Sequence, residues 1–195
     1  MMGLPAFRKP EPRLADERIF LRLPRRGDHE EWARLRGESR DFLEPWEPRW
    51  ALDELSPAAW RDRLRRYRTE FAEGTAVPFL IFEQEHGRMA GGISLSNIRY
   101  GVSQSASIGY WMGARYAGQG MMVAALKLLI PYSFDTLRLH RLEAACIPDN
   151  NRSIRVLEKA GFTREGLLHS YLKINSAWQD HYLYALVSDR AGNQN

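Results

Sequence analysis

A glycine-rich turn, RYAGQGMM at residues 115–122, stands between a strand-like run at 105–113 and a long apolar helical pattern. Glycines that open a helix let the backbone approach a bound group without a clash from Cβ, and the helix N-terminus adds partial positive charge. Three kinds of site share this design: the nucleotide-binding P-loop, the dinucleotide-binding turn and the diphosphate cradle of acyl-CoA enzymes. A turn that only starts a helix is the fourth alternative.

The residues of the turn discriminate among these alternatives. A P-loop requires G-x-x-x-x-G-K-[ST], and although Gly113 and Gly118 have the right separation, Gln-Gly follows, so both essential side chains are missing. A dinucleotide turn requires G-x-G-x-x-G, but Val123 stands at the third glycine, and the preceding segments look like an antiparallel meander. The pattern R-x-x-G-x-G, with Arg115 and Gly120, predicts a metal-free diphosphate site that suits coenzyme A.

Composition sets the broad class of the protein. The 195 residues are expected to form one domain at 15–188, between a flexible leader at 1–14 and a tail at 189–195. The net charge of +4 suits a polyanionic cofactor, but the basic residues are dispersed, so we expect no direct binding of nucleic acid. No apolar run is long enough to predict a membrane span. Cys146, the single cysteine, fits a reducing cytoplasm and is expected to be a small buried residue in a strand.

Hydrophobic periodicity predicts seven strands and four helices. The strands are expected at 17–24, 77–84, 88–100, 105–113, 139–147, 162–174 and 177–187. The helices are expected at 27–43, 56–74, 118–134 and 151–161, with a kink or an end near Pro131. The order β-α-α-β-β-β-α-β-α-β-β indicates an α+β fold with a mixed sheet.

A second motif lies downstream of the glycine turn. NNRSIRVLEKAGF at 150–162 matches N-x-x-S-x-x-x-x-E-K-x-G-F, and the turn itself directly follows GYWMG. Together these motifs resemble those of the GNAT superfamily of N-acetyltransferases. RDFLEPWEP (40–48) and YLKINSAWQDHYLYAL (171–186) further resemble the RimJ/RimL-type ribosomal-protein N-terminal acetyltransferases, on the RimJ side of that branch. The resemblance covers about residues 15–188.

The resemblance implies a GNAT fold and an acetyl-CoA site without a metal. The sheet would be mixed and mostly antiparallel, with about seven strands flanked by about four helices, and splayed between the fourth and fifth strands. The strand at 108–113 would pair with the pantetheine arm, and a backbone N–H near Met112 would bind the developing oxyanion. The residues implied for cofactor binding are Met112, Arg115, Ala117, Gly118, Gln119, Gly120, Met121, Met122, Asn150 and Ser153.

The same resemblance suggests a general acid. Ser153 lies where family members protonate the departing sulfur, but a serine near the start of a helix is also a common capping residue. Asn150 resembles the asparagine that binds the cofactor arm, and it too has N-capping as its alternative.

The general base is not given by the family pattern. Many relatives carry glutamate where this chain has Ser107, so the next candidate is Glu143, an acid inside an otherwise apolar strand. The alternative for Glu143 is an outward-facing residue paired with an arginine. Other options are His169, Asp180 and His181. A water chain is a further alternative, since an α-amine has a pKa of about 7.7–8.0 and is partly neutral at physiological pH.

The acceptor pocket is expected between the first two helices and the last hairpin. Aromatic side chains there are predicted either to line a peptide groove or to cap the core from outside: Trp46, Trp50, Tyr171 and Trp178. Glu44 and Glu47, in the same segment, either attract a cationic amine or are solvated.

These patterns predict a cytoplasmic, acetyl-CoA-dependent N-acetyltransferase that acts on a protein N-terminal α-amine. The expected acceptor is an alanine-type ribosomal-protein N-terminus, and the expected route is direct transfer in a ternary complex. The alternatives are acetylation of a small-molecule amine, such as an amino acid or aminoglycoside, and a non-catalytic acyl-CoA-binding module. Ser107 at the family's base position favours the last of these.

Overall fold

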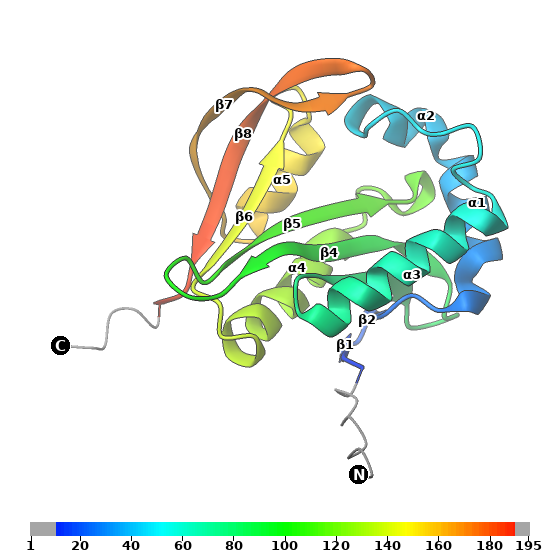
Figure 1. Cartoon of the computed structure of the whole chain (residues 1–195), viewed down its shortest axis with the longest axis horizontal. Helices are drawn as coiled ribbons and strands as arrows, with labels where there is room; N and C mark the ends of the chain where they lie inside the picture. The colour runs from blue at the N-terminus through cyan, green and yellow to red at the C-terminus, as the bar shows by residue number, and fades with distance from the viewer. Residues whose placement is uncertain (1–10, 190–195) are drawn as a thin grey trace, which may run out of the picture.

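The structure, a computed structural model, describes residues 11–189, which form one sheet with helices on both faces (Figure 1). The strands are β1 (Arg13–Ala15), β2 (Ile19–Arg22), β3 (Val77–Glu83), β4 (Met89–Arg99), β5 (Ser105–Met112), β6 (Arg141–Cys146), β7 (Thr163–Ile174) and β8 (Ala177–Val187). The α-helices are α1 (His29–Glu38), α2 (Arg40–Leu43), α3 (Pro57–Glu73), α4 (Met121–Pro131) and α5 (Asn151–Lys159). Three 3-10 turns and one π-helical turn complete the list: η1 (Arg26–Asp28), η2 (Glu44–Trp46), η3 (Ala114–Tyr116) and η4 (Tyr132–Thr136).

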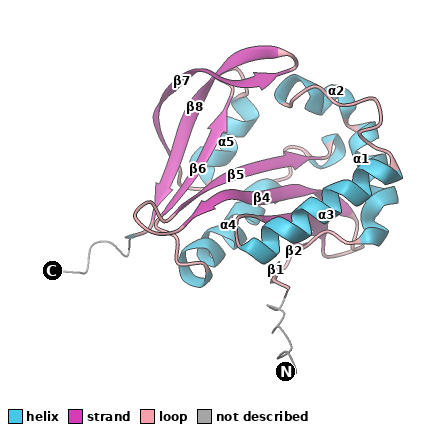
Figure 2. Cartoon of the chain, viewed as in Figure 1, coloured by secondary structure: helices cyan, strands magenta, loops and turns pink. Residues whose placement is uncertain are grey.

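The sheet has the order β1-β2-β3-β4-β5-β6-β8-β7, and every pair is antiparallel except β5 with β6. That parallel pair is short, because it runs only from Ser105 opposite Arg141 to Ser107 opposite Glu143. Beyond it the two strands diverge, as Figures 1 and 2 show. The predicted mixed, mostly antiparallel α+β sheet, splayed at this place, is confirmed.

Helices cover the two faces of the sheet unequally. In Figure 1, α3 lies in front of the half formed by β2 to β5, α1 stands at its right-hand edge, and α4 lies behind it. The helix α4 contacts β1 and β2, while α5 contacts β6. Four apolar side chains at helical spacing are buried in α4 (Met122, Ala125, Leu126 and Leu129), while Ile130 and Phe134 after them are partly buried. The start of α4 and the side of α5 therefore lie next to the gap between β5 and β6.

Local signals set the ends of the long helices. The Ser56 hydroxyl accepts a hydrogen bond from the Ala59 N–H at 3.1 Å and caps α3, and Gly74 ends it in the left-handed conformation. Gly120, with φ of +78°, precedes the first residue of α4. Pro131 is the last residue of α4, so the predicted end near this proline is confirmed.

Two predicted segments differ from the structure. The helix expected at 27–43 is divided at Ser39, whose backbone leaves the helical region (φ −105°, ψ 11°) and whose buried hydroxyl accepts a hydrogen bond from the Ala114 N–H at 2.9 Å. This break gives a fifth α-helix and ties α1 to the segment that precedes the glycine turn. An eighth strand, β1, includes residues 13 and 14 of the expected leader, and residues 1–10 of that leader lie outside the described part of the chain. The expected tail also lies outside it, except for residue 189.

Candidate active site

The gap between the splayed strands opens into a cavity of about 610 Å³. Its wall begins at the glycine turn before α4, passes along β5 and the first turns of α5, and reaches the segment after α2. Since β5 and β6 pair only up to Ser107 and Glu143, the cavity continues between them into the sheet. A long, narrow ligand can therefore cross from one face of the sheet to the other.

The glycine turn forms one end of this cavity. Gly118 and Gly120 have φ of +77° and +78°, a conformation that other residues adopt at a cost, and a Cβ on Gly118 would point into open space. The side chain of Arg18, from the β1–β2 connection, donates a hydrogen bond to the Gln119 carbonyl at 2.7 Å and fixes the turn. The amides at the start of α4 have the helix N-terminus behind them, so this end suits an anion.

Most of the residues predicted for cofactor binding are brought together here. Those that line the cavity are Met112, Ala117, Gly118, Gly120, Met121, Met122, Asn150 and Ser153. Arg115 and Gln119 belong to the turn but do not line the cavity. The Arg115 guanidinium lies over the Tyr116 ring and 3.5 Å from the Glu38 carboxylate, and the Gln119 side chain donates to the Arg115 carbonyl.

Three cations on α5 also line the cavity, and they were not predicted from the sequence. They are Arg152, Arg155 and Lys159, and the Arg152 guanidinium lies over the Phe42 ring at 4.8 Å. Their spacing of three and four residues puts them on one face of the helix. This spacing is visible in the sequence and could have indicated a cationic helix face. Together with the glycine turn they give this part of the cavity a positive character.

Ser153 lies in the middle of the cavity and is hydrogen-bonded. Its N–H donates to Asn150 Oδ1 at 3.0 Å, so Asn150 is the N-cap of α5. Its hydroxyl oxygen lies 2.7 Å from the hydroxyl oxygen of Tyr110, a β5 residue that the sequence did not single out. Burial raises the pKa of Tyr110 well above its ordinary value, so the phenol stays protonated and Ser153 keeps a hydroxyl partner.

Cys146 lies in β6, is buried as predicted and also lines the cavity. Burial raises the pKa of its thiol to about 11, against a lowering effect of Ser153. A thiol with this pKa is almost wholly protonated at neutral pH, so it is a weak nucleophile.

The four candidate bases occupy different places. Glu143 forms an ion pair with Arg141 at 2.7 Å and does not line the cavity, which matches its structural alternative. His169 and Asp180 pair with each other at 3.0 Å on the exposed part of the β7–β8 hairpin. His181 alone among the four lines the cavity; it is 3% exposed, and its Nδ1 lies 3.0 Å from the Gln179 carbonyl oxygen.

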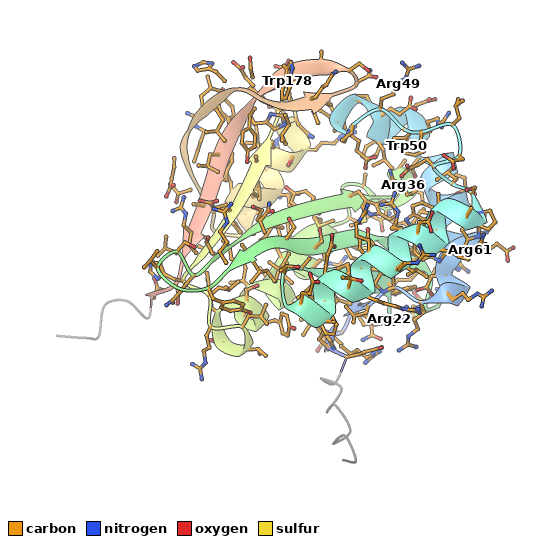
Figure 3. The ribbon with its side chains drawn as sticks, viewed as in Figure 1. Arg22, Arg36, Arg49, Trp50, Arg61 and Trp178 are labelled. Atoms are coloured by element: carbon orange, nitrogen blue, oxygen red, sulfur yellow. The ribbon has the colours of Figure 1, made fainter. Side chains whose placement is uncertain are left out.

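A second cavity, of about 420 Å³, lies between α1, α3 and the face of β3, β4 and β5. Trp50 lines this cavity, whereas Trp46 lines the first one. Tyr171 and Trp178 line neither: they are exposed on the hairpin, where Figure 3 shows Trp178 far from the labelled Arg36 and Trp50. Of the four predicted acceptor residues, Trp46 and Trp50 therefore line a cavity, whereas Tyr171 and Trp178 do not.

An ion pair between the buried Arg36 and Glu47, whose side chain is 21% exposed, organises the second cavity. Arg36 is 6% exposed and donates to both carboxylate oxygens of Glu47, at 3.2 Å and 2.5 Å, while the Trp50 indole N–H donates to one of them at 2.8 Å. The Arg36 guanidinium also lies over the rings of Trp50 and Trp111, at 4.5 Å and 5.0 Å. Gly92 makes room for this arrangement, because a Cβ there would lie 2.4 Å from the Trp111 indole nitrogen.

Residues 11–189 contain neither a cluster of metal ligands nor a membrane-spanning helix. No group of three or more His, Cys, Asp or Glu side chains in this range could hold a metal ion. No helix in the same range is long and apolar enough to cross a membrane.

Known proteins resemble this chain in sequence. The family model described as acetyltransferase (GNAT) domain matches residues 18–163. The probable N-acetyltransferase YjcK of Bacillus subtilis is 37% identical over 175 residues, which cover 90% of this chain and 97% of that protein. The [ribosomal protein uS5]-alanine N-acetyltransferase of Escherichia coli is 34% identical over 179 residues, which cover 92% of each chain.

A solved structure of a RimJ protein is similar to this chain in both fold and sequence. Mycobacterium smegmatis RimJ in complex with CoA-disulfide superposes with a TM-score of 0.85 at 33% identity, over 95% of this chain and 90% of that one. The chain therefore belongs to the acetyltransferase (GNAT) domain family, in its RimJ/RimL-type branch, and is an N-acetyltransferase.

Proposed function

We propose that this N-acetyltransferase uses acetyl-CoA to acetylate the N-terminal α-amine of a protein. The observation that carries the proposal is the first cavity, which runs from the glycine turn, past the Tyr110–Ser153 pair, to the segment that holds Trp46. One end of it is suited to a diphosphate, and the other is lined by aromatic side chains. We place the protein in the cytoplasm, where ribosomal proteins are made.

The residues present fit coenzyme A. The turn at Gly118 and Gly120 leaves room for a diphosphate on the α4 amides, and the α5 cations lie along the same wall. The unpaired edge of β5 beyond Ser107 suits the amide-containing pantetheine arm, with Met112 beside it. When bound, acetyl-CoA supplies the activated acetyl thioester.

The side chains of the cavity then have separate tasks in direct transfer. Ser153 is placed to give its hydroxyl proton to the departing sulfur, and Tyr110 holds that hydroxyl in position. His181 is the candidate that takes a proton from the attacking amine, either directly or through water. Both assignments involve groups that line the same cavity.

The proposed acceptor is a polypeptide chain that begins with alanine. The E. coli relative is named for the alanine of ribosomal protein uS5, and this chain covers nearly all of that enzyme's length. The aromatic lining at Trp46 and Trp50 provides flat apolar surface for the first residues of such a chain.

The test is to follow release of free thiol from acetyl-CoA with short peptides and with small amines as acceptors. Faster turnover of Ala- or Ser-starting peptides than of amino acids or aminoglycosides supports the proposal. Turnover of small amines alone would mean that the acceptor is a small-molecule amine and not a protein N-terminus. Tight CoA binding without transfer to any amine would mean a non-catalytic binding module.

A further inference from the structure

The two cavities meet at three residues. Glu47, Tyr110 and Trp111 line both of them, and Glu47 is the charged member of this set. Tyr110 is already bonded to Ser153, so the junction lies next to the proposed site of transfer. The other charged side chains that line the first cavity, on α5, are cationic. The second cavity is lined by Glu54 and three arginines as well, and Arg36 and Arg63 are paired with Glu47 and Glu54. At the junction itself the charged group is the Glu47 carboxylate.

Hydrogen bonds hold the carboxylate of Glu47 in one orientation, and one of its two oxygens accepts only a single, long hydrogen bond. Oε2 accepts from Arg36 Nη2 and from the Trp50 indole N–H, at 2.5 Å and 2.8 Å. Oε1 accepts only from Arg36 Nη1, at the longer distance of 3.2 Å. Each carboxylate oxygen has two acceptor sites, so Oε1 retains capacity for another donor.

Three indoles surround the guanidinium that balances this carboxylate. The Arg36 Cζ atom lies 5.7 Å, 4.5 Å and 5.0 Å from the rings of Trp32, Trp50 and Trp111. The negative faces of the rings offset part of the arginine charge. A second cation near Oε1 is then repelled less than it would be beside an uncovered guanidinium.

Neighbouring contacts hold the Glu47 backbone as well. Its carbonyl accepts a hydrogen bond from the Asn175 N–H at 3.2 Å, which joins this segment to the tip of the β7–β8 hairpin. Glu44, three residues earlier in the chain, is more exposed: its side chain is 41% exposed, against 21% for Glu47, and is paired with the half-exposed Arg40 at 3.4 Å. The structure thus separates two acids that look alike in the sequence.

We propose that Glu47 binds the α-amine of the acceptor through Oε1, so that the amine is presented to the Tyr110–Ser153 end of the junction. The proposal rests on the proposed acetyl transfer and assigns the amine-binding group of the acceptor site. The second cavity then holds the chain that follows the amine.

The test pairs a change in the protein with a change in the ligand. A hexapeptide that starts with alanine is compared with the same peptide carrying a propionyl group in place of that alanine, which removes only the amine. Affinities are measured by calorimetry with CoA present instead of acetyl-CoA, so no turnover occurs. The variant is Glu47→Gln, and Glu44→Gln is the matched control.

We expect the wild-type protein to bind the amine peptide about 10- to 100-fold more tightly than the propionyl peptide. In Glu47→Gln this difference should disappear, while CoA affinity and the propionyl affinity stay within about twofold of wild type. Glu44→Gln should keep the full difference. These results would support the proposal, because a residue that only shapes the cavity would weaken both peptides equally.

Equal loss of both peptides in Glu47→Gln, or a retained difference between them, overturns the proposal. So does a wild-type protein that binds the two peptides alike, a measurement that stands even if the variant fails to fold. If wild type acetylates only a small amine, the proposed acceptor is wrong. The role of Glu47 is then tested by measuring the affinities of that amine and of its deamino analogue for wild type, Glu47→Gln and Glu44→Gln.

Discussion

The cofactor side and the acceptor side of the cleft have walls of different origin. On the cofactor side the wall comes mostly from two short stretches, the turn at 117–122 and α5. On the acceptor side it comes from α1, the loop at 47–50, α3 and the strands β3 to β5, and here Arg36 and Trp111 lie far apart in the sequence but in contact in space. A wall made of two short stretches leaves compact motifs in the sequence, whereas a wall assembled from distant segments does not.

The largest expected effect tests whether the cofactor side depends on backbone shape. Gly118→Asp puts a carboxylate where we place the diphosphate, so CoA affinity should fall about 1000-fold, or ~4 kcal/mol, in calorimetry. Gly101→Asp is the matched control, because Gly101 has nearly the same φ, +75° against +77°, and open space around its missing Cβ. Both variants should unfold at similar urea concentrations. Unchanged affinity in Gly118→Asp would remove the diphosphate from this turn.

The next effect tests whether the acceptor side depends on its ion pair. Arg36→Met leaves the Glu47 carboxylate without its main partner in a poorly solvated place, so we expect a loss of about 3 kcal/mol in the free energy of unfolding. Arg40→Met removes an exposed i,i+4 pair and should cost less than about 0.5 kcal/mol. Urea denaturation measures both. Similar losses in the two variants would contradict the role given to the buried pair.

A third effect concerns the place where the two sides meet. Ser153→Ala should lower kcat about 100-fold with little change in CoA affinity, and Tyr110→Phe should lower it about tenfold. The double variant should be no worse than Ser153→Ala, because Tyr110 acts through the serine hydroxyl. Since the pKa of Tyr110 is raised, no titration of kcat by this phenol is expected below about pH 10. Additive losses would show that the two hydroxyls work separately.

The smallest effect distinguishes the two pairs of aromatic residues on the acceptor side. Trp46→Ala removes a ring that lines the first cavity, so the acceptor KM should rise about tenfold. Trp178→Ala removes a side chain that is 63% exposed and lines neither cavity, so KM should change by less than about twofold. Steady-state kinetics with one peptide acceptor measures both. A larger effect at Trp178 would mean that the hairpin closes over the acceptor.

The sequence was most informative where one local rule determines the result. Ser56 and Asn150 cap helices that begin at Pro57 and Asn151, next to or at the predicted starts, whereas α4 begins at Met121, three residues after its predicted start. The division of the first helix at Ser39 was missed; the Ser39 hydroxyl accepts a hydrogen bond from Ala114, 75 residues later, a contact that no local pattern contains. Arg36 was missed for a related reason: an arginine on a helix is usually solvated, and only the tertiary fold surrounds this one with indoles.

The short parallel contact of β5 with β6 has a thermodynamic consequence. Beyond Ser107 and Glu143, the backbone groups that face the gap have no strand partner within residues 11–189. A ligand that bonds to them completes the sheet, and binding then stabilises the folded chain by RT ln(1 + [L]/Kd), about 2.7 kcal/mol at a hundred times Kd. Hydrogen exchange should slow at 108–112 when CoA is added, while the β2–β3 ladder stays unchanged. In this sense the coenzyme that we propose would be a temporary member of the sheet as well as the acyl donor.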